Sequence, residues 1–282
     1  MRVKSIKLFL VFLLAGCAIY EPHELPLPQE IQIVWDIREL DIYEYITPYL
    51  IPLEIEYFYD EPYEPPLSDD LYVQNIPVEV SLPMVALTFD DGPGRYTEAI
   101  LDLLEAVGGK ATFCVIGKQI NYYPEAIIRM AAMGSEVIGH SWSHPILTNL
   151  SDDDIAAQIQ NTSKLIYELT GTAPRIHRAP FGKTNRRVLD VSAKLGYSLL
   201  SWSIDTRDWQ HQDPELIYRS IMDYVVCGSI IVLHDIHTAT KEAMIRVIPR
   251  LVEKGFNLVT ASELIAHHYG ELEPGRLYIG IR

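Results

Sequence analysis

From Leu82 onward the sequence alternates between short apolar runs and longer amphipathic stretches. Runs typical of buried strands occupy residues 84–89, 110–117, 135–140, 175–180, 197–203, 229–235 and 256–264. Helix-like stretches lie between them, at residues 97–108, 122–134, 151–171, 185–196, 214–226 and 240–255. This alternation is typical of an α/β fold with parallel strands that are buried on both faces. The pattern alone does not separate a barrel from an open sheet.

Several of the helix-like stretches carry recognisable ends. Ser151, followed three residues later by Asp154, predicts a helix N-cap. Glycines at the C-terminal ends of the stretches are suited to left-handed C-caps: Gly108, Gly134, Gly171, Gly196 and Gly255. The predicted helices therefore have defined boundaries as well as periodicity.

The net charge of −15 is concentrated in one segment. Residues 18–82 carry 15 Asp and Glu against a single Arg, whereas residues 83–282 carry 23 acidic and 19 basic residues and are nearly balanced. Proline and like charge disfavour long helices in residues 18–82, which we interpret as an acidic, Pro- and Tyr-rich spacer with room for a short strand or two. The sequence contains no basic patch of the kind that binds nucleic acid.

The N-terminus has the features of an export signal. Residues 1–7 are basic, residues 8–14 are apolar but too short to span a bilayer comfortably, and the run "LLAGC" ends at Cys17. This run resembles the lipobox of bacterial lipoproteins, which implies cleavage and attachment to the membrane through a lipidated Cys17. We therefore expect residues 1–17 to be a signal peptide of an extracytoplasmic lipoprotein, with a simply secreted protein as the alternative.

The two remaining cysteines, Cys114 and Cys227, lie in apolar runs, where a cysteine is most often a small buried hydrophobic residue. The sequence neither predicts nor excludes a disulfide bridge between these two cysteines.

Two adjacent carboxylates, Asp90 and Asp91, directly follow the first strand-like run in "VALTFDDGPG". The Asp-Asp-Gly-Pro sequence is ordinary turn chemistry, and a turn with no further role is one reading. Neighbouring like charges repel, however, and a cation that neutralises one of them would explain the pair. Because catalytic groups collect at the carboxyl ends of parallel strands, further ligands are then expected after other strands.

Such groups do follow the later strands. His140 and His144 stand four residues apart, a spacing with which two imidazoles on one helical turn can reach a single zinc ion alongside Asp91. Loop residues with no metal are the alternative. Arg178 could hold Asp90 ionised, and His234 is suited to general acid catalysis.

Five segments in this order are similar to the motifs of the polysaccharide deacetylases, the NodB homology domain of carbohydrate esterase family 4. These are "TFDDGP", "HSWSH", "RAPFG", "DTRDW" and "IVLHD". The resemblance covers about residues 83–266. It implies a distorted (β/α) barrel of about seven parallel strands and a divalent metal, most often Zn²⁺, with Co²⁺ or other ions possible. We place this domain at residues 83–270, with a C-terminal tail at 271–282.

The resemblance also implies roles for these residues. Asp91, His140 and His144 would hold the metal, whose bound water would attack the acetyl carbonyl. Asp90 would be the catalytic base, and Arg178 would orient it.

His234 would protonate the leaving amine, and Asp208 would orient His234. The main-chain N–H of Phe181 would complete an oxyanion hole with the metal, and Trp209 and Leu233 would line the acetyl pocket.

The function implied is hydrolysis of N-acetyl groups on an extracellular glycan, with N-acetylglucosamine of peptidoglycan as the expected substrate. An O-acetyl esterase of the xylan type and a chitooligosaccharide deacetylase are the enzymatic alternatives, and an inactive carbohydrate-binding lipoprotein is the non-enzymatic one. The third motif has Ala179 where proline is common and Phe181 where tyrosine is common. Since the oxyanion donor is a main-chain N–H, this departure affects substrate preference rather than the chemistry.

Overall fold

The computed structural model describes residues 8–10, 51–53 and 82–281. The predicted lipobox and Cys17, and nearly all of the predicted spacer, lie outside the described residues. Within that spacer, strand β2 (Ile51–Leu53) pairs antiparallel with β1 (Leu8–Leu10). Among the described helices, none combines the length and apolarity that a membrane crossing needs.

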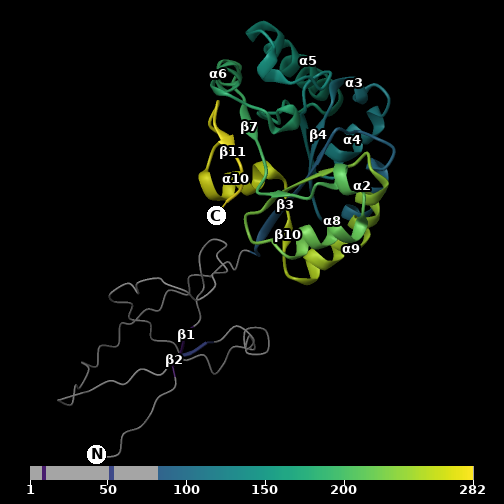
Figure 1. The fold of residues 1–282 in the computed structure, drawn as a ribbon, viewed down its shortest axis with the longest axis vertical. Coiled ribbons are helices and arrows are strands. Elements are labelled where there is room, and N and C mark those ends of the chain that lie inside the picture. Colours follow the sequence, from purple (N-terminus) through teal and green to yellow (C-terminus); the bar gives the residue numbers. More distant parts are fainter. Residues whose placement is uncertain (1–7, 11–50, 54–81, 282) are drawn as a thin grey trace, which may run out of the picture. The chain divides into compact units, whose positions relative to one another are not determined.

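Residues 82–281 form an α/β fold around one parallel sheet (Figure 1). In spatial order the strands are β11 (Leu277–Tyr278), β7 (Ser198–Leu200), β6 (Ile176–His177), β5 (Glu136–Gly139), β4 (Thr112–Val115), β3 (Met84–Asp90), β9 (Ile230–His234) and β8 (Ile204–Asp205), and β10 (Asn257–Leu258) also pairs with β3. The order ends at β11 on one side and β8 on the other. The predicted distorted barrel is therefore confirmed as a curled, incompletely closed sheet.

Six of the described helices follow the predicted stretches, whereas those at residues 117–120, 208–211 and 261–269 were not predicted. The described helices are α2 (Thr97–Ala106), α3 (Gly117–Ile120), α4 (Pro124–Ala132), α5 (Asp152–Thr170), α6 (Arg186–Lys194), α7 (Asp208–His211), α8 (Pro214–Met222), α9 (Thr238–Glu253) and α10 (Ala261–Tyr269), with short 3₁₀ helices η2 (Leu147–Asn149) and η3 (Pro180–Gly182). Ser151 caps α5 by accepting from the main-chain N–H of Asp154, as predicted. The five predicted glycine caps all have positive φ: Gly108, Gly134, Gly171, Gly196 and Gly255.

The last predicted strand, residues 256–264, is mostly wrong. Only Asn257–Leu258 is a strand, because Thr260 and Glu263 form a capping box that starts α10 at Ala261. The run 197–203 is likewise cut short at Leu200, and the chain enters a second strand, β8, at Ile204. The C-terminal tail contributes β11, which pairs parallel with β7.

Strand β3 divides its side chains between two apolar clusters, as the two-residue period of a strand requires. Val85, Leu87 and Phe89 pack in a cluster with residues of helices that include α2, α8 and α9. Ala86 packs in a second cluster with residues of the other strands and of α10. In Figure 1, α2, α8 and α9 lie on one side of β3 and α10 on the other. The alternation leaves Asp90, at the strand's carboxyl end, facing the same way as Ala86.

The bridge between Cys114 and Cys227 that the sequence left open is not formed, since Cys114 is a free, buried cysteine. It occupies β4 and pairs in register with Asp90 of β3. Cys227 is also buried, and its Sγ accepts a hydrogen bond from the main-chain N–H of Met84 at 3.3 Å.

Candidate metal and catalytic site

The three predicted metal ligands come together beyond the carboxyl ends of β3 and β5. One ligand atom from each of Asp91, His140 and His144 lies within 4.8 Å of the others. Nε2 of His144 is 3.1 Å and Nε2 of His140 is 3.6 Å from Oδ1 of Asp91. The prediction that the two histidines share a helical turn is wrong, because residues 140–144 form an irregular loop in which Ser141 and His144 have left-handed φ of 65° and 59°.

Neighbouring groups fix the two imidazoles in this loop. Nδ1 of His140 is 2.9 Å from the carbonyl oxygen of Arg178, which leaves Nε2 facing the carboxylates. The main-chain N–H of His144 donates to Oγ of Ser141 at 2.9 Å. Oε1 of Gln158, on α5, accepts from the main-chain N–H of Ser143 at 2.9 Å and so ties the loop to that helix.

The donor set fits a divalent metal such as zinc. Two imidazole nitrogens and one carboxylate oxygen are the protein ligands of many catalytic zinc sites, and such sites keep positions open for water and substrate. Oδ1 of Asp91 is buried and accepts no hydrogen bond, although buried carboxylate oxygens normally have partners. Burial opposes ionisation of Asp91, but His144 and His140 outweigh it and lower its pKa to about 2. The carboxylate is therefore charged and ready to ligate a cation.

Asp90 forms a buried ion pair with Arg178. The side chain of Arg178 is inaccessible to solvent, and its Nη1 donates to Oδ1 of Asp90 at 2.6 Å. The same Nη1 also donates to Oγ1 of Thr88 at 2.8 Å, and Nη2 donates to the carbonyl oxygen of Ser201 at 2.9 Å, whereas the buried Nε has no hydrogen-bond partner among the described residues. Burial opposes the charge on Asp90, but the guanidinium and the imidazole of His140 lower the pKa of Asp90 below its ordinary value.

His234 lies beside Asp90 in the sheet, since the two residues pair in register between β9 and β3. Its Nδ1 is 2.7 Å from Oδ1 of Asp208, and its main-chain N–H donates to Oδ2 of the same carboxylate at 2.7 Å. Burial opposes protonation, but the hydrogen bond and charge of Asp208 raise the pKa of His234 to about 9. His234 therefore carries a proton near neutral pH, with Nδ1 held by Asp208.

The three residues predicted to line the substrate pocket differ in their exposure to solvent. Phe181 is 58% exposed, and its ring centre is 4.6 Å from that of His144. Trp209 is 54% exposed and follows Asp208, whose Oδ1 accepts its main-chain N–H. Leu233 is fully buried in the cluster that contains Phe89. A pocket formed by all three residues stays a prediction.

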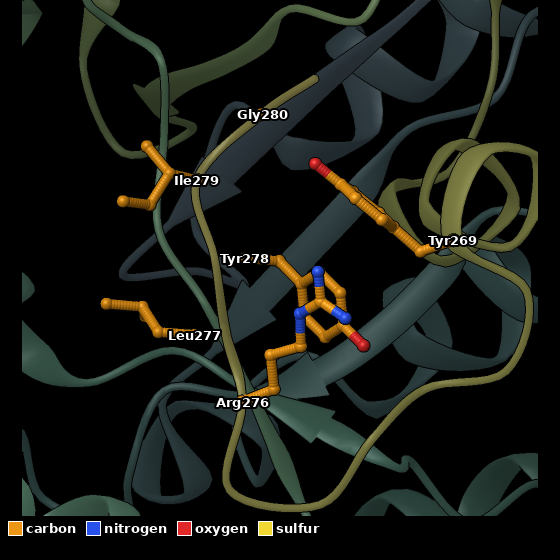
Figure 2. Close-up of a pocket in the computed structure, with 6 residues that line it drawn as sticks. All are labelled: Tyr269, Arg276, Leu277, Tyr278, Ile279 and Gly280. Carbon is orange, nitrogen blue, oxygen red and sulfur yellow. The ribbon is translucent and has the colours of Figure 1, made fainter. Parts of the chain in front are cut away.

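A separate pocket of about 200 Å³ lies against β11 and the end of α10 (Figure 2). Its lining consists of Tyr269, Arg276, Leu277, Tyr278, Ile279 and Gly280. The guanidinium of Arg276 lies over the rings of Tyr269 and Tyr278 and is paired with Glu273. No predicted site residue contributes to this pocket.

The site also uses residues that the sequence analysis did not single out. Thr240 of α9 donates to Oδ2 of Asp208 at 2.6 Å, and Thr88 bridges Arg178 to the carbonyl of Ile231. Nothing in the local sequence marks either threonine. They are recognised only because the fold places a hydroxyl beside a buried carboxylate or guanidinium.

Asp235 supports the loop that carries Asp91. It is fully buried, accepts a hydrogen bond from Oγ1 of Thr97, and lies so close to Gly92 that a Cβ there would overlap both of its carboxylate oxygens. Burial raises the pKa of Asp235 to about 7. Asp235 directly follows His234 in "IVLHD", but nothing in this motif indicates which residues it packs against.

Comparisons with known proteins agree with this geometry. The family model for polysaccharide deacetylase matches residues 78–200. A chitooligosaccharide deacetylase of Sinorhizobium fredii is 35% identical over 201 residues, which are 66% of this chain and 94% of that protein. The chain belongs to the polysaccharide deacetylase family.

Other members of the family are equally similar. The peptidoglycan-N-acetylmuramic acid deacetylase PdaC of Bacillus subtilis is 37% identical over 66% of this chain. An acetyl xylan esterase of Clostridium thermocellum, solved with a cobalt ion, has a TM-score of 0.66 and 32% identity over 70% of this chain and 98% of its own. This chain spans only 40% of PdaC, so it matches less than half of that relative.

The packing of Gly92 against Asp235 leads to a test of how the Asp91 loop is held. We expect Gly92→Ala to weaken zinc binding by about tenfold, because the added methyl group displaces the loop that presents the carboxylate. A zinc titration against a competing chelator measures this.

Gly108→Ala is the matched control. Gly108 has φ of 63° and open space around it, so the substitution is expected to cost about 1 kcal/mol of stability and to leave zinc affinity unchanged. Equal zinc affinity in Gly92→Ala and the wild type would show that Asp235 does not position Asp91.

Proposed function

We propose that this chain is a metal-dependent deacetylase that removes N-acetyl groups from a glycan outside the cytoplasm, with N-acetylglucosamine of peptidoglycan as the preferred substrate. The proposal is supported by similarity to deacetylases of peptidoglycan and of chitooligosaccharides. The signal-like N-terminus and the predicted lipidation of Cys17 agree with a substrate outside the cytoplasm and belong to the same proposal.

One observation carries the chemical part of the proposal. One deprotonated group and one protonated group flank the cluster of Asp91, His140 and His144. Asp90 is held as a carboxylate by Arg178, and His234 is held as a protonated imidazole by Asp208. Amide hydrolysis needs one group that accepts a proton from water and another that gives a proton to the leaving amine.

Asp91, His140 and His144 would hold the metal. When bound, a divalent cation lowers the pKa of a water ligand and polarises the acetyl carbonyl. The neutral imidazole of His140 suits this role, since burial lowers its pKa.

Asp90 accepts the proton of the attacking water. The guanidinium of Arg178 occupies Oδ1, and Oδ2 faces the cluster, 3.8 Å from Nε2 of His140. The ion pair thus leaves one oxygen of the base directed at the metal site.

His234 delivers a proton to the leaving nitrogen. Asp208 fixes its ring through Nδ1, so that Nε2 is the atom left to donate. The main-chain N–H of Phe181, in the left-handed turn of η3, would donate to the developing oxyanion.

An O-acetyl esterase remains the alternative, supported by the acetyl xylan esterase with a TM-score of 0.66. The same groups would serve ester hydrolysis. A purely carbohydrate-binding role is disfavoured by the joint presence of the ion-paired Asp90 and the protonated His234.

Acetate release from several glycans tests the proposal. The metal-stripped chain, titrated with zinc, should release acetate from peptidoglycan faster than from chitooligosaccharide or acetylxylan. Faster release from acetylxylan would favour the esterase. No release from any of the three, with zinc bound, would refute the deacetylase proposal for these substrates.

Replacing the two adjacent carboxylates should have different effects. We expect Asp90→Asn to keep its zinc and to lose turnover by about 10²–10⁴-fold, because only the base is removed. Asp91→Ala should lose zinc itself, since it removes a ligand. Metal content by atomic absorption and acetate release measure the two effects, and wild-type turnover in Asp90→Asn would contradict the base assignment.

The pH dependence should report on His234. The acid must be protonated, so activity is lost as pH rises through its pKa of about 9. Asp208→Asn removes the charge that raises this pKa, and the alkaline limb of kcat/KM should therefore move to lower pH. The exposed Asp205→Asn is the control and should leave the limb in place. An unmoved limb in Asp208→Asn would show that His234 is not the acid.

A further inference from the structure

Three arginines of the described chain lack a carboxylate partner. The other arginines among residues 82–281 each pair with Asp or Glu. Arg95, Arg175 and Arg207 form no such pair in this part of the chain. All three are exposed. Arg175 precedes β6, at the strand end opposite the site, whereas Arg95 and Arg207 lie in segments that follow the carboxyl ends of β3 and β8.

Arg95 is connected to His234 by a series of contacts. Its guanidinium lies 4.8 Å from the ring centre of Tyr96, and the hydroxyl of Tyr96 is hydrogen-bonded to Oγ1 of Thr238. His237, which precedes Thr238 in the chain, has its ring centre 5.9 Å from that of His234. These contacts place Arg95 and His237 on the side of the site that carries the proposed acid.

Arg207 lies on the same side. It is directly followed by Asp208, the carboxylate that binds His234. Its backbone is held in the left-handed region, with φ of 49°, and its N–H donates to Oδ1 of Asp205 at 2.9 Å. We call Arg95, Arg207 and His237 the cationic rim.

The rim is suited to an anionic group on the substrate. A guanidinium binds a carboxylate through two parallel hydrogen bonds, and an exposed guanidinium without a protein partner keeps these donors available. Burial lowers the pKa of His237, so near neutral pH its ring offers hydrogen bonds rather than charge. The two arginines therefore supply the positive charge.

The candidate substrates differ in this respect. Chitooligosaccharides and acetylxylan chains made only of neutral sugars carry no carboxylate. The glycan of peptidoglycan alternates N-acetylglucosamine with N-acetylmuramic acid. The lactyl carboxyl of N-acetylmuramic acid forms an amide with the stem peptide, and it is a free carboxylate in strands from which that peptide has been removed. A cation beside the leaving-amine side of the site can therefore distinguish the two kinds of glycan.

We infer that the cationic rim, with Arg95 as its main contributor, is a subsite for the carboxylate of a sugar next to the one that is deacetylated. The inference rests on the proposed function and adds the reason why an acidic glycan would be preferred to a neutral one.

Binding measurements test the rim independently of turnover. The zinc-loaded Asp90→Asn chain is titrated with an oligosaccharide of alternating N-acetylglucosamine and N-acetylmuramic acid, and with the same oligosaccharide after its lactyl carboxylates are converted to methyl amides. We expect the acidic form to bind about tenfold more tightly, as for a hydrogen bond to a charged group. The preference should shrink as salt is added.

Variants of the same protein assign the effect to Arg95. Adding Arg95→Ala should remove most of the preference by weakening binding of the acidic glycan alone, and Arg95→Lys should restore part of it. Arg175→Ala is the matched control and should keep the full preference. Equal affinity for the two glycans, or equal weakening of both by Arg95→Ala, would overturn the inference.

Turnover of the wild-type chain on the same two glycans separates this inference from the proposed function. Acetate release from both glycans with equal KM would leave the deacetylase proposal standing and reject the rim. A binding preference that depends on Arg95, without acetate release, would reject the deacetylase proposal for these glycans and support the rim.

Discussion

The buried ion pair between Arg178 and Asp90 links the main parts of the site. Burying two charges is costly unless their geometry and remaining hydrogen bonds compensate, and removing one partner leaves an unpaired buried charge. Here the guanidinium is also bound by Thr88 and by the carbonyl of Ser201, while the carbonyl of Arg178 itself orients His140. One residue therefore holds the base through its side chain and a metal ligand through its main chain.

The histidines of the site show how the environment separates residues of one type into different roles. His140 faces a carbonyl on one side and carboxylates on the other, and burial lowers its pKa. His234 has the carboxylate of Asp208 at Nδ1, which raises its pKa to about 9. A neutral imidazole is a metal ligand and a protonated one is an acid, so the two partners decide the two functions.

Backbone strain is concentrated in the loops that carry the residues of the site. Asp91, Ser141, His144, Phe181 and Arg207 all have φ between 49° and 69°, a region that residues with a side chain seldom adopt. Such conformations persist where the surrounding structure fixes them. Asp235 packed against Gly92 and Gln158 bonded to the loop of the histidines are the contacts that do so here.

The alternation of strands and helices, the helix caps and the identity of the chemical groups can be predicted from the local sequence. They follow from local periodicity and from motifs at the carboxyl ends of strands, where Asp90, His140 and His234 lie. The apolar residues at 256–264 predict a single strand, but this segment divides between a strand and a helix, because the capping box of Thr260 and Glu263 outweighs the β-branched and apolar residues that precede it. The sequence could not predict that the two histidines would lie in a strained loop rather than on a helical turn.

Which of these groups are in contact depends on how distant segments pack against one another. The supports of the site come from distant segments: Thr240 lies 32 residues from Asp208, and Arg178 lies 88 residues from Asp90. Their hydroxyl and guanidinium groups have no periodic signature, and their partners are set by strand order and register. The charge state of each catalytic group depends on these contacts, because burial and the nearest opposite charge determine its pKa.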